Sequence, residues 1–313
     1  MEPTNRPLES EAYVMDEKDR SIVVLDAPSN LGLAPPRPGA EPGCRGLASA
    51  LRDRGILGRI GAKEGGRIDP PPYSADVDPV TGVRNGEALR VFSINLAERI
   101  ESFVRAGTFP VVLGGDCSIL VGNMLALRRI GRFGLAFLDG HLDFRHPGNS
   151  ELVGAAAGAD LALVTGRGPD RIADIDGLGP LVRDGDVIAL GEREDYPEWR
   201  DIHETDITVR DLGELRALGS AQAALKFVGR MEAGGVDGFW IHLDADVLDD
   251  AIMPAVDSRQ PGGLSHSELV ELLRGLLRSG LAVGIEVTIF DPELDPTGEI
   301  AERFAGALVK AFS

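Results

Sequence analysis

Two segments of the chain carry carboxylate and imidazole side chains at alternate positions. Asp139, His141 and Asp143 follow one apolar run, and Asp244 and Asp246 follow another. Alternate side chains of an extended segment point the same way, so we expect each set to converge on one side of its segment. Carboxylate oxygens and imidazole nitrogens are common metal ligands. The pattern therefore predicts a metalloenzyme with room for two metal ions.

The apolar runs that precede these residues are expected to be buried strands that alternate with helices. Continuous apolar strands between helices are typical of a parallel sheet covered on both faces, so we predict a three-layer α/β/α fold with a mostly parallel central sheet. Ser265 and Glu268 have the spacing of a capping box at a helix start. The expected strands are 21–26, 109–113, 135–138, 186–190, 239–243 and 282–290, and the expected helices are 84–106, 119–129, 158–165, 220–233, 267–278 and 299–312.

The polar clusters all follow expected strands. Ligands of open parallel sheets bind beyond the carboxyl ends of the strands, so we expect these clusters to assemble one site on one rim. Residues 1–18 are polar and are expected to form a flexible N-terminal segment. No internal repeat, linker or change of composition divides residues 19–313, which favours a single domain.

Composition excludes several classes of protein. The net charge of −18 argues against nucleic-acid and anionic-membrane partners, which require a basic surface. Two cysteines are too few for a disulfide framework. No apolar run approaches the roughly 18 residues of a membrane span, and the N-terminus lacks a basic-then-apolar signal. These features predict a cytoplasmic protein.

Three motifs resemble those of the ureohydrolase family, which includes arginase, agmatinase and formimidoylglutamase. The family patterns are Gly-Gly-Asp-His-Ser, Asp-Ala-His-x-Asp and Ser-x-Asp-x-Asp with a later Pro-Gly-Gly. This chain has Gly114-Gly-Asp-Cys117-Ser, Asp139-Gly-His-Leu-Asp143, His242-Leu-Asp-Ala-Asp246 and then Pro261-Gly-Gly. The similarity runs from about residue 20 to the C-terminus. Cys117 in place of histidine indicates a divergent branch of the family.

The resemblance implies a binuclear metal centre, with manganese as the first expectation. It assigns one metal to Cys117, Asp139, Asp143 and Asp244, and the other to Asp139, His141, Asp244 and Asp246. A thiolate is a softer ligand than an imidazole, so Cys117 would also allow Zn²⁺, Co²⁺ or Fe²⁺. The alternative for Cys117 is a small buried side chain beside the glycine turn.

Two catalytic positions of the family differ in this chain. The histidine that shuttles protons aligns with Ala157, and His146 or His242 could take its place. The glutamate that holds the guanidinium aligns with Ile289, and Glu286 or Asp291 could substitute for it. Glu286 has an alternative role as a hydrogen-bond partner of a metal ligand. The substrate-binding candidates are Arg145, His146, Asp195 and Glu286.

The resemblance implies hydrolysis of a linear C–N bond in a guanidino or amidine compound by a metal-bridged hydroxide. Asp143, His141 and Glu286 are the catalytic candidates. The two replacements argue against ordinary arginase or agmatinase activity and favour a modified arginine such as N-hydroxyarginine. The alternative function is a metal-binding relative without catalysis that acts as a partner or sensor subunit. A homo-oligomer is possible, as in other members of the family.

Overall fold

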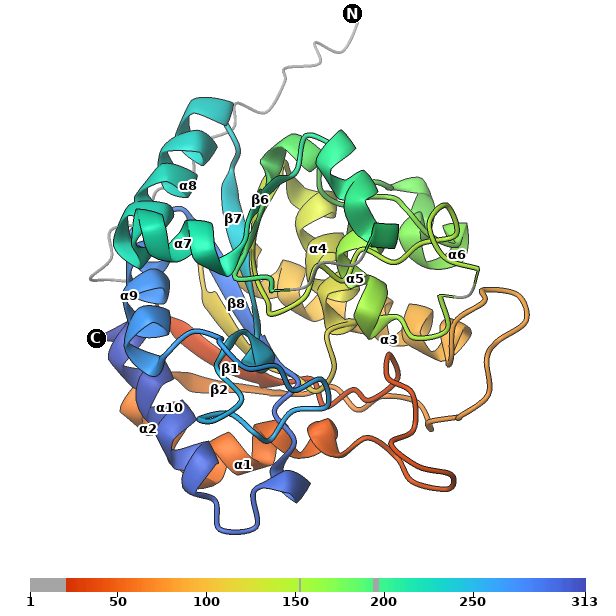
Figure 1. Ribbon diagram of the computed structural model, residues 1–313, viewed down its shortest axis with the longest axis horizontal. Coiled ribbons are helices and arrows are strands. Elements are labelled where there is room, and N and C mark those ends of the chain that lie inside the picture. Colours follow the sequence, from red (N-terminus) through yellow and green to blue (C-terminus); the bar gives the residue numbers. More distant parts are fainter. Residues whose placement is uncertain (1–20, 152, 194–196) are drawn as a thin grey trace, which may run out of the picture.

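The computed structural model describes residues 21–151, 153–193 and 197–313, and its centre is an eight-stranded sheet (Figure 1). The strand order is β2-β1-β3-β8-β7-β4-β5-β6, and every neighbouring pair is parallel. The strands are β1 (Ile22–Asp26), β2 (Lys63–Arg67), β3 (Phe109–Leu113), β4 (Phe133–Leu138), β5 (Val187–Leu190), β6 (Thr208–Arg210), β7 (Gly238–Asp244) and β8 (Ala282–Thr288).

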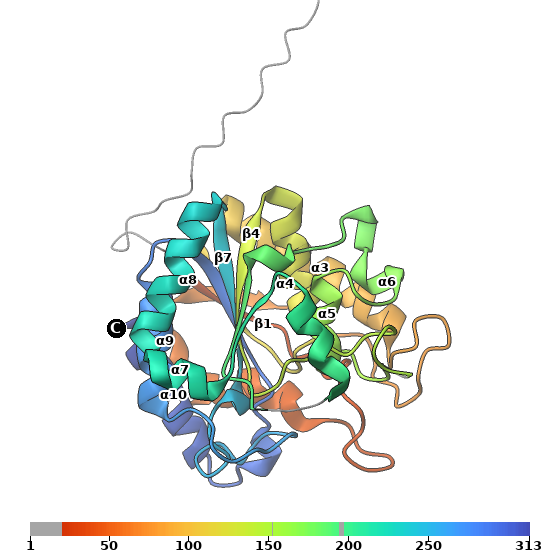
Figure 2. The same cartoon turned by 45° about the horizontal axis from the view of Figure 1, so that its top comes forward.

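Helices cover both faces of this sheet, which confirms the predicted three-layer α/β/α fold with a parallel centre. One layer holds α1, α2 and α7 to α10, and the other holds α3 to α6 (Figures 1 and 2). The helices are α1 (Leu47–Asp53), α2 (Ile56–Arg59), α3 (Gly86–Arg105), α4 (Ile119–Ile130), α5 (Asp160–Val164), α6 (Asp170–Ala173), α7 (Leu212–Leu218), α8 (Ser220–Gly234), α9 (His266–Leu277) and α10 (Glu299–Phe312).

The strands send alternate side chains into two hydrophobic cores. In β7, Phe239, Ile241 and Leu243 pack in the core beneath α8 to α10, whereas Trp240 packs in the core beneath α3 to α5. Side chains alternate along a strand, so His242 faces the same layer as Trp240. This buried polar residue therefore points toward α4 and α5.

Most predicted elements are present, and the exceptions have local causes. The predicted helix 158–165 is shorter, since α5 begins at Asp160 after a 3₁₀ turn over Ala157–Ala159. The last strand ends at Thr288 instead of residue 290, because Ile289 has a positive φ of 71°. The capping box at Ser265 is confirmed. The predicted flexible segment 1–18 lies outside the described residues.

The sequence did not predict β2, β6, or helices α1, α2, α6 and α7. Strand β2 is a sheet-edge strand with two central glycines, and its other residues are exposed polar side chains. Without an apolar run, such a strand has no signal in the hydrophobic pattern. The missed helices are all seven residues or shorter.

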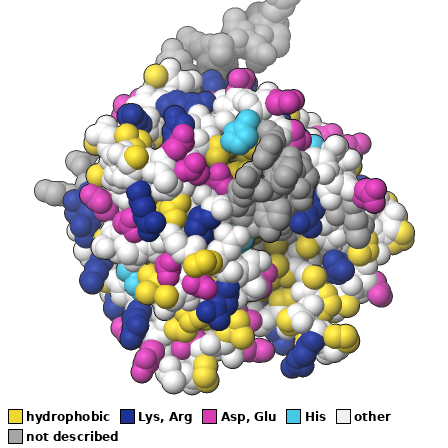
Figure 3. Space-filling model, viewed as in Figure 1, with side chains coloured by type: hydrophobic (Ala, Val, Ile, Leu, Met, Phe, Trp, Pro, Cys, Tyr) yellow, Lys and Arg dark blue, Asp and Glu magenta, His cyan; other side chains and the backbone are white. Residues whose placement is uncertain are grey.

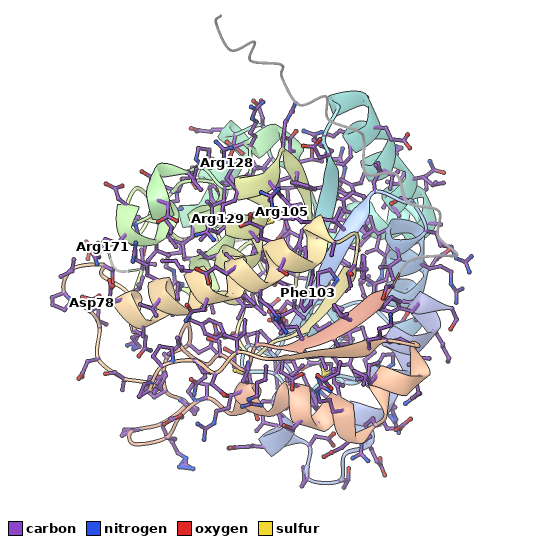
Figure 4. All side chains as sticks on the ribbon, turned by 180° about the vertical axis from the view of Figure 1, so that it is seen from behind. Asp78, Phe103, Arg105, Arg128, Arg129 and Arg171 are labelled. Carbon is purple, nitrogen blue, oxygen red and sulfur yellow. The ribbon has the colours of Figure 1, made fainter. Side chains whose placement is uncertain are left out.

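Ion pairs connect charged side chains on several parts of the surface. On the face in Figure 3, acidic and basic side chains lie intermixed. On the opposite face, Arg129 of α4 and Arg171 of α6 lie near α3 (Figure 4), and they pair with Asp176 and Glu87. These ion pairs connect neighbouring elements within the layer that contains α3 to α6. No helix in the described residues is long and apolar enough to span a membrane.

Candidate metal centre

The register of three adjacent strands brings the sequence motifs together. Leu138 at the end of β4 pairs with Leu243 of β7, so Asp139 and Asp244 each lie one residue beyond this pair. Asp244 in turn pairs with Thr288 of β8. Cys117 follows β3, the other neighbour of β8. The carboxyl ends of four neighbouring strands thus form the predicted rim.

Two groups of side chains at this rim could each hold a metal ion. The first consists of Cys117, Asp139, His242 and Asp244, and the second of Asp139, His141 and Asp246. In each group the ligand atoms lie within 4.8 Å of one another, and every residue is buried. Asp139 belongs to both groups, so one carboxylate lies between the two candidate positions.

Hydrogen bonds orient these side chains. The Cys117 thiol donates to Asp244 Oδ2 at 2.8 Å, and His141 Nδ1 lies 2.9 Å from Asp246 Oδ2. Backbone amides also donate to the aspartates, from His141 to Asp139 Oδ1 and from Asp246 to Asp244 Oδ1, both at 2.7 Å. The carboxylates are thereby held in place by the turns that follow the strands.

The turn before Cys117 depends on glycine. A Cβ atom at Gly115 would overlap the carbonyl oxygen of Ser29, so only glycine lets the two loops approach this closely. Asp116 accepts hydrogen bonds from the Ser29 hydroxyl at 2.7 Å and from the Ser118 amide at 2.9 Å. These bonds tie the turn to the loop after β1, and Cys117 lies among the aspartates.

Burial and mutual contact perturb the protonation of the cluster. Burial raises the pKa of the Cys117 thiol, and the nearby Asp244 carboxylate raises it further. Burial also raises the pKa of Asp244, and the negative charges of Asp246 and Asp139 add to this effect. For Asp139, burial alone would raise the pKa, but contacts with His141 and His242 outweigh burial and lower it. Several acidic groups thus lie close together with little access to water, and bound divalent cations stabilise such an arrangement.

The donor set fits divalent metal ions. It combines carboxylate oxygens, imidazole nitrogens and one sulfur atom, all of which are ligands of transition metals. Within the described residues, Asp139 Oδ2 and His242 Nε2 are buried without a hydrogen-bond partner. Buried polar atoms are rarely left unpaired, so these two atoms are available as ligands.

A cavity of about 350 Å³ opens onto the cluster. Four of the candidate ligands line it: Cys117, His141, Asp244 and Asp246. Asp143 also lines the cavity, although it belongs to neither ligand group. Asp143 has a φ of 44°, so the chain leaves the extended conformation there. The simple alternation expected for residues 139 to 143 therefore does not describe how Asp143 is placed.

The predicted substrate-binding residues do not all line the cavity. Arg145 lines the cavity. His146 is not among the described lining residues, and its ring contacts Asp201 Oδ2 at 2.8 Å and the Gly148 amide at 3.0 Å. Asp195 lies outside the described residues. Local contacts therefore hold His146, and its role as a proton shuttle stays a prediction.

Glu286 lies in the sheet and does not line the cavity. Its Oε1 is 2.5 Å from His242 Nδ1, and its Oε2 accepts a hydrogen bond from Asn123. The structure thus favours the alternative for Glu286, a hydrogen bond to a neighbouring candidate ligand, over direct contact with substrate. Asp291 Oδ1 accepts a hydrogen bond from the Glu293 amide at 2.8 Å, and Asp291 also lines an adjoining cavity.

Sequence reasoning did not select Asn123 or Asp160. Both are fully buried within otherwise apolar stretches of α4 and α5, and they lie next to Glu286 and His242. An isolated polar residue on an apolar helix was the available signal. Asp257 and Ser258 in the cavity wall also went unselected.

The assembled rim agrees with the comparisons of sequence and fold. The sequence matches the Arginase family over residues 20–313. This chain belongs to the arginase family. It is 30% identical to an arginase of Agrobacterium fabrum over 90% of this chain and 87% of that protein. It is 26% identical to an arginase of Staphylococcus aureus over 94% of this chain and 97% of that protein.

Solved structures show the same fold. The arginase of Bacillus caldovelox superposes with a TM-score of 0.84 at 25% identity, covering 94% of this chain and 98% of that one. The proclavaminate amidino hydrolase of Streptomyces clavuligerus superposes with a TM-score of 0.68 at 21% identity, covering 95% and 94% of the two chains.

Membership of the arginase family confirms the predicted resemblance and the enzyme class. Proteins of this family hydrolyse guanidino C–N bonds, and this chain is a hydrolase of the same type. The family holds a binuclear divalent metal centre, and the two ligand groups described above are compatible with one. A small-molecule substrate fits such an enzyme.

Proposed function

We propose that this enzyme hydrolyses a guanidino compound whose guanidine is only weakly basic, such as N-hydroxyarginine. The observation that carries the proposal is the presence of Ala157 and Ile289 in the cavity wall. They stand where the family motifs have a proton-shuttling histidine and a guanidinium-holding glutamate. A fully charged guanidinium would meet an aliphatic side chain at the second position, without a carboxylate to pair with it.

A weakly basic guanidine is less affected by the replacement at Ile289. A hydroxyl group withdraws electron density from the guanidine, so the group carries its positive charge for less of the time near neutral pH. Such a substrate gains less from a carboxylate partner. Release of urea or hydroxyurea frees the same alkylamine nitrogen, so the loss of general acid catalysis, typically worth about 10²–10⁴-fold in rate, affects both substrates and the preference comes from the guanidine itself.

The charges of the cavity support one orientation of an amino acid substrate. Asp143, Asp246 and Asp257 line it, and Arg145 is the one arginine or lysine among the described lining residues. A guanidinium group pairs well with a carboxylate through parallel hydrogen bonds. We therefore place the substrate carboxylate at Arg145 and the guanidine near the aspartates.

The cavity leaves room for more than a small guanidine. It shares Leu33, Ala34, Asp257 and Ile289 with an adjoining cavity of about 520 Å³. Arg37, Glu41 and Glu293 line the adjoining cavity. An extended guanidino compound with a polar tail could occupy both, so the tested substrates should include longer derivatives.

The metal ions are also part of the proposal. Two divalent ions would lower the pKa of a water molecule and would stabilise the negative charge on its oxygen beside the guanidine carbon. Asp139, His141, Asp143, Asp244, Asp246 and Cys117 would hold them. We propose manganese as the native metal, and the thiolate of Cys117 would widen the choice to Zn²⁺, Co²⁺ or Fe²⁺.

A substrate panel with the metal-loaded enzyme tests the proposal. Arginine, N-hydroxyarginine, agmatine and longer guanidines are compared by release of urea or hydroxyurea. We expect kcat/KM for N-hydroxyarginine to exceed that for arginine by about 10-fold or more, because only the charged guanidinium loses a charge-assisted hydrogen bond worth roughly 1.5–3 kcal/mol. Turnover of arginine near 10 s⁻¹, an ordinary enzyme rate, would contradict the proposal. No turnover of any compound would instead support a non-catalytic role.

A further inference from the structure

His242 is a fully buried histidine that is fixed from two directions. Its ring stacks on Phe137 with a centroid distance of 4.5 Å and an interplanar angle of 10°. Its Nδ1 lies 2.5 Å from Glu286 Oε1, and Asn123 of α4 donates to the other oxygen of Glu286. The ring plane and the role of Nδ1 are thus set by residues from β4, β8 and α4.

The other ring nitrogen, Nε2, faces two carboxylate oxygens. It lies 3.8 Å from Asp139 Oδ2 and 3.9 Å from Asp160 Oδ2, which is too far for a hydrogen bond. All three atoms are buried, and none has a hydrogen-bond partner within the described residues. Polar atoms that are removed from water without partners are costly, so three of them around one space favour the binding of a cation there.

This arrangement has the features of a metal-binding histidine. Such histidines almost always donate their second ring N–H to a carboxylate or carbonyl, which fixes the tautomer and directs the free lone pair at the metal. Glu286 is the carboxylate here, so the lone pair lies at Nε2. Two atoms that each bond an ion at about 2.1 Å can lie up to about 4.2 Å apart, a range that includes the observed separations.

We propose that His242 is a metal ligand and supplies the imidazole that the family motif places at position 117. His242 would share the ion with Asp139, Asp244 and Cys117, its companions in the first ligand group. Asp160 Oδ2 is a further oxygen close to Nε2. The imidazole thus reaches the ion from inside β7 instead of from the turn after β3. This inference deepens the proposed function, since both need the metal centre.

The competing explanation is a purely structural ion pair. A protonated His242 could be held among Glu286, Asp139 and Asp160 without any metal. The two explanations differ in what happens to metal binding when the imidazole is removed, and in whether moving an imidazole to position 117 compensates. They also differ in the number of imidazole ligands on the bound metal.

The experiment compares four variants of the full-length protein with the parent. They are His242→Ser, Cys117→His, the double variant His242→Ser/Cys117→His, and His266→Ser as a histidine control in α9. Manganese and cobalt are titrated calorimetrically, and bound metal is measured by elemental analysis after dialysis. X-ray absorption of the cobalt-loaded proteins counts imidazole ligands, and circular dichroism checks that each variant is folded.

We expect two ions per chain in the parent and in His266→Ser. His242→Ser should weaken one of the two ions by more than about 100-fold, the upper range for losing an outer-shell partner. The double variant should recover most of that loss. X-ray absorption should find two imidazoles per metal pair in the parent, from His141 and His242, and one in His242→Ser.

Unchanged affinity for both ions in folded His242→Ser would overturn the proposal, as would a single imidazole per metal pair in the parent. The parent spectrum decides the question even if His242→Ser does not fold. The proposed function fails separately. Two bound ions with His242 as ligand but no turnover of any guanidine would leave this inference standing, whereas guanidine turnover without His242 ligation would leave only the proposed function.

Discussion

Two regions of the molecule use the same kinds of side chain under different conditions. In the cavity, Asp143 and Arg145 are partly exposed. Behind it, His242, Asp160 and Glu286 are fully buried. Water and substrate can reach the first set, so its charges can influence what binds. The buried set must find its partners within the fold or in a bound ion, so it constrains the metal and the packing around it.

The two replaced family positions show the same division. Ile289 and Ala157 lie in the cavity wall, whereas the carboxylates of the family motifs lie beneath it, with His242 and Asp160 as buried neighbours. Ile289 has a φ of 71°, a conformation that is strained for a β-branched side chain. A strained residue in a cavity wall is consistent with a role in substrate choice.

The largest expected effect follows from removing the residue that joins both ligand groups. Asp139→Ala should abolish binding of both ions and reduce turnover below detection, because Asp139 belongs to each group. Elemental analysis after dialysis and an assay of guanidine hydrolysis measure the two outcomes. Asp250→Asn, on the loop beyond β7, is the matched control and should keep both ions. Retention of two ions by Asp139→Ala would show that the groups are independent of it.

The next effect tests the buried region alone. Glu286→Gln should weaken metal binding by about 10–100-fold, the usual cost of losing an outer-shell partner of a ligand, because it perturbs the contact with His242 Nδ1. KM for substrate should change little, since Glu286 does not line the cavity. Calorimetric metal titration and steady-state kinetics at saturating metal separate these results. A large rise in KM at saturating metal would return Glu286 to the role of a substrate contact.

A substitution in the cavity wall should instead change substrate preference, with metal binding unchanged. Ile289→Glu should raise kcat/KM for arginine by about 10-fold or more, because a charge-assisted hydrogen bond contributes roughly 1.5–3 kcal/mol and a carboxylate would then face the guanidinium. Ile289→Gln is the uncharged control and should not show this gain. The measurement is the ratio of kcat/KM for arginine and N-hydroxyarginine, with metal content constant. An unchanged ratio would mean that the guanidine lies elsewhere in the cavity.

A smaller and more selective effect is expected at the other end of the substrate. Arg145→Gln should raise KM by about 10-fold for substrates with a carboxylate, in line with the loss of a charge-assisted hydrogen bond. Agmatine lacks that carboxylate, so its KM should stay nearly constant. Paired kinetics on the two substrate types measure the difference. Equal effects on both would indicate that Arg145 shapes the cavity without contacting the substrate carboxylate.

The smallest effect lies outside both regions. Ser265→Ala removes the side-chain cap of α9, where Ser265 Oγ accepts from the Glu268 amide at 3.2 Å. The free energy of unfolding should fall by about 1 kcal/mol, with metal stoichiometry and substrate preference unchanged. Chemical denaturation and metal analysis measure both. A change in metal binding would show that the two regions are sensitive to general destabilisation, and the larger effects above would then need correction for it.

The sequence by itself was sufficient for the central strands, the three-layer fold and the rim of carboxylates. Buried parallel strands must be apolar runs, and Asp139 or Asp244 directly after such a run has no packing role. These signals are local, within a few residues of each other. The edge strand β2 was not predicted, because an exposed strand with two glycines has no apolar pattern.

Only the tertiary structure decided which polar residues meet in the core. His242, Glu286, Asp160 and Asn123 come from two strands and two helices, and no spacing along the chain relates them. Their convergence depends on the packing of α4 and α5 against the sheet and on the register of β7 and β8, where His242 pairs with Glu286. Residues that are far apart in the sequence come together because whole helices and strands pack against one another, and no short motif specifies that packing.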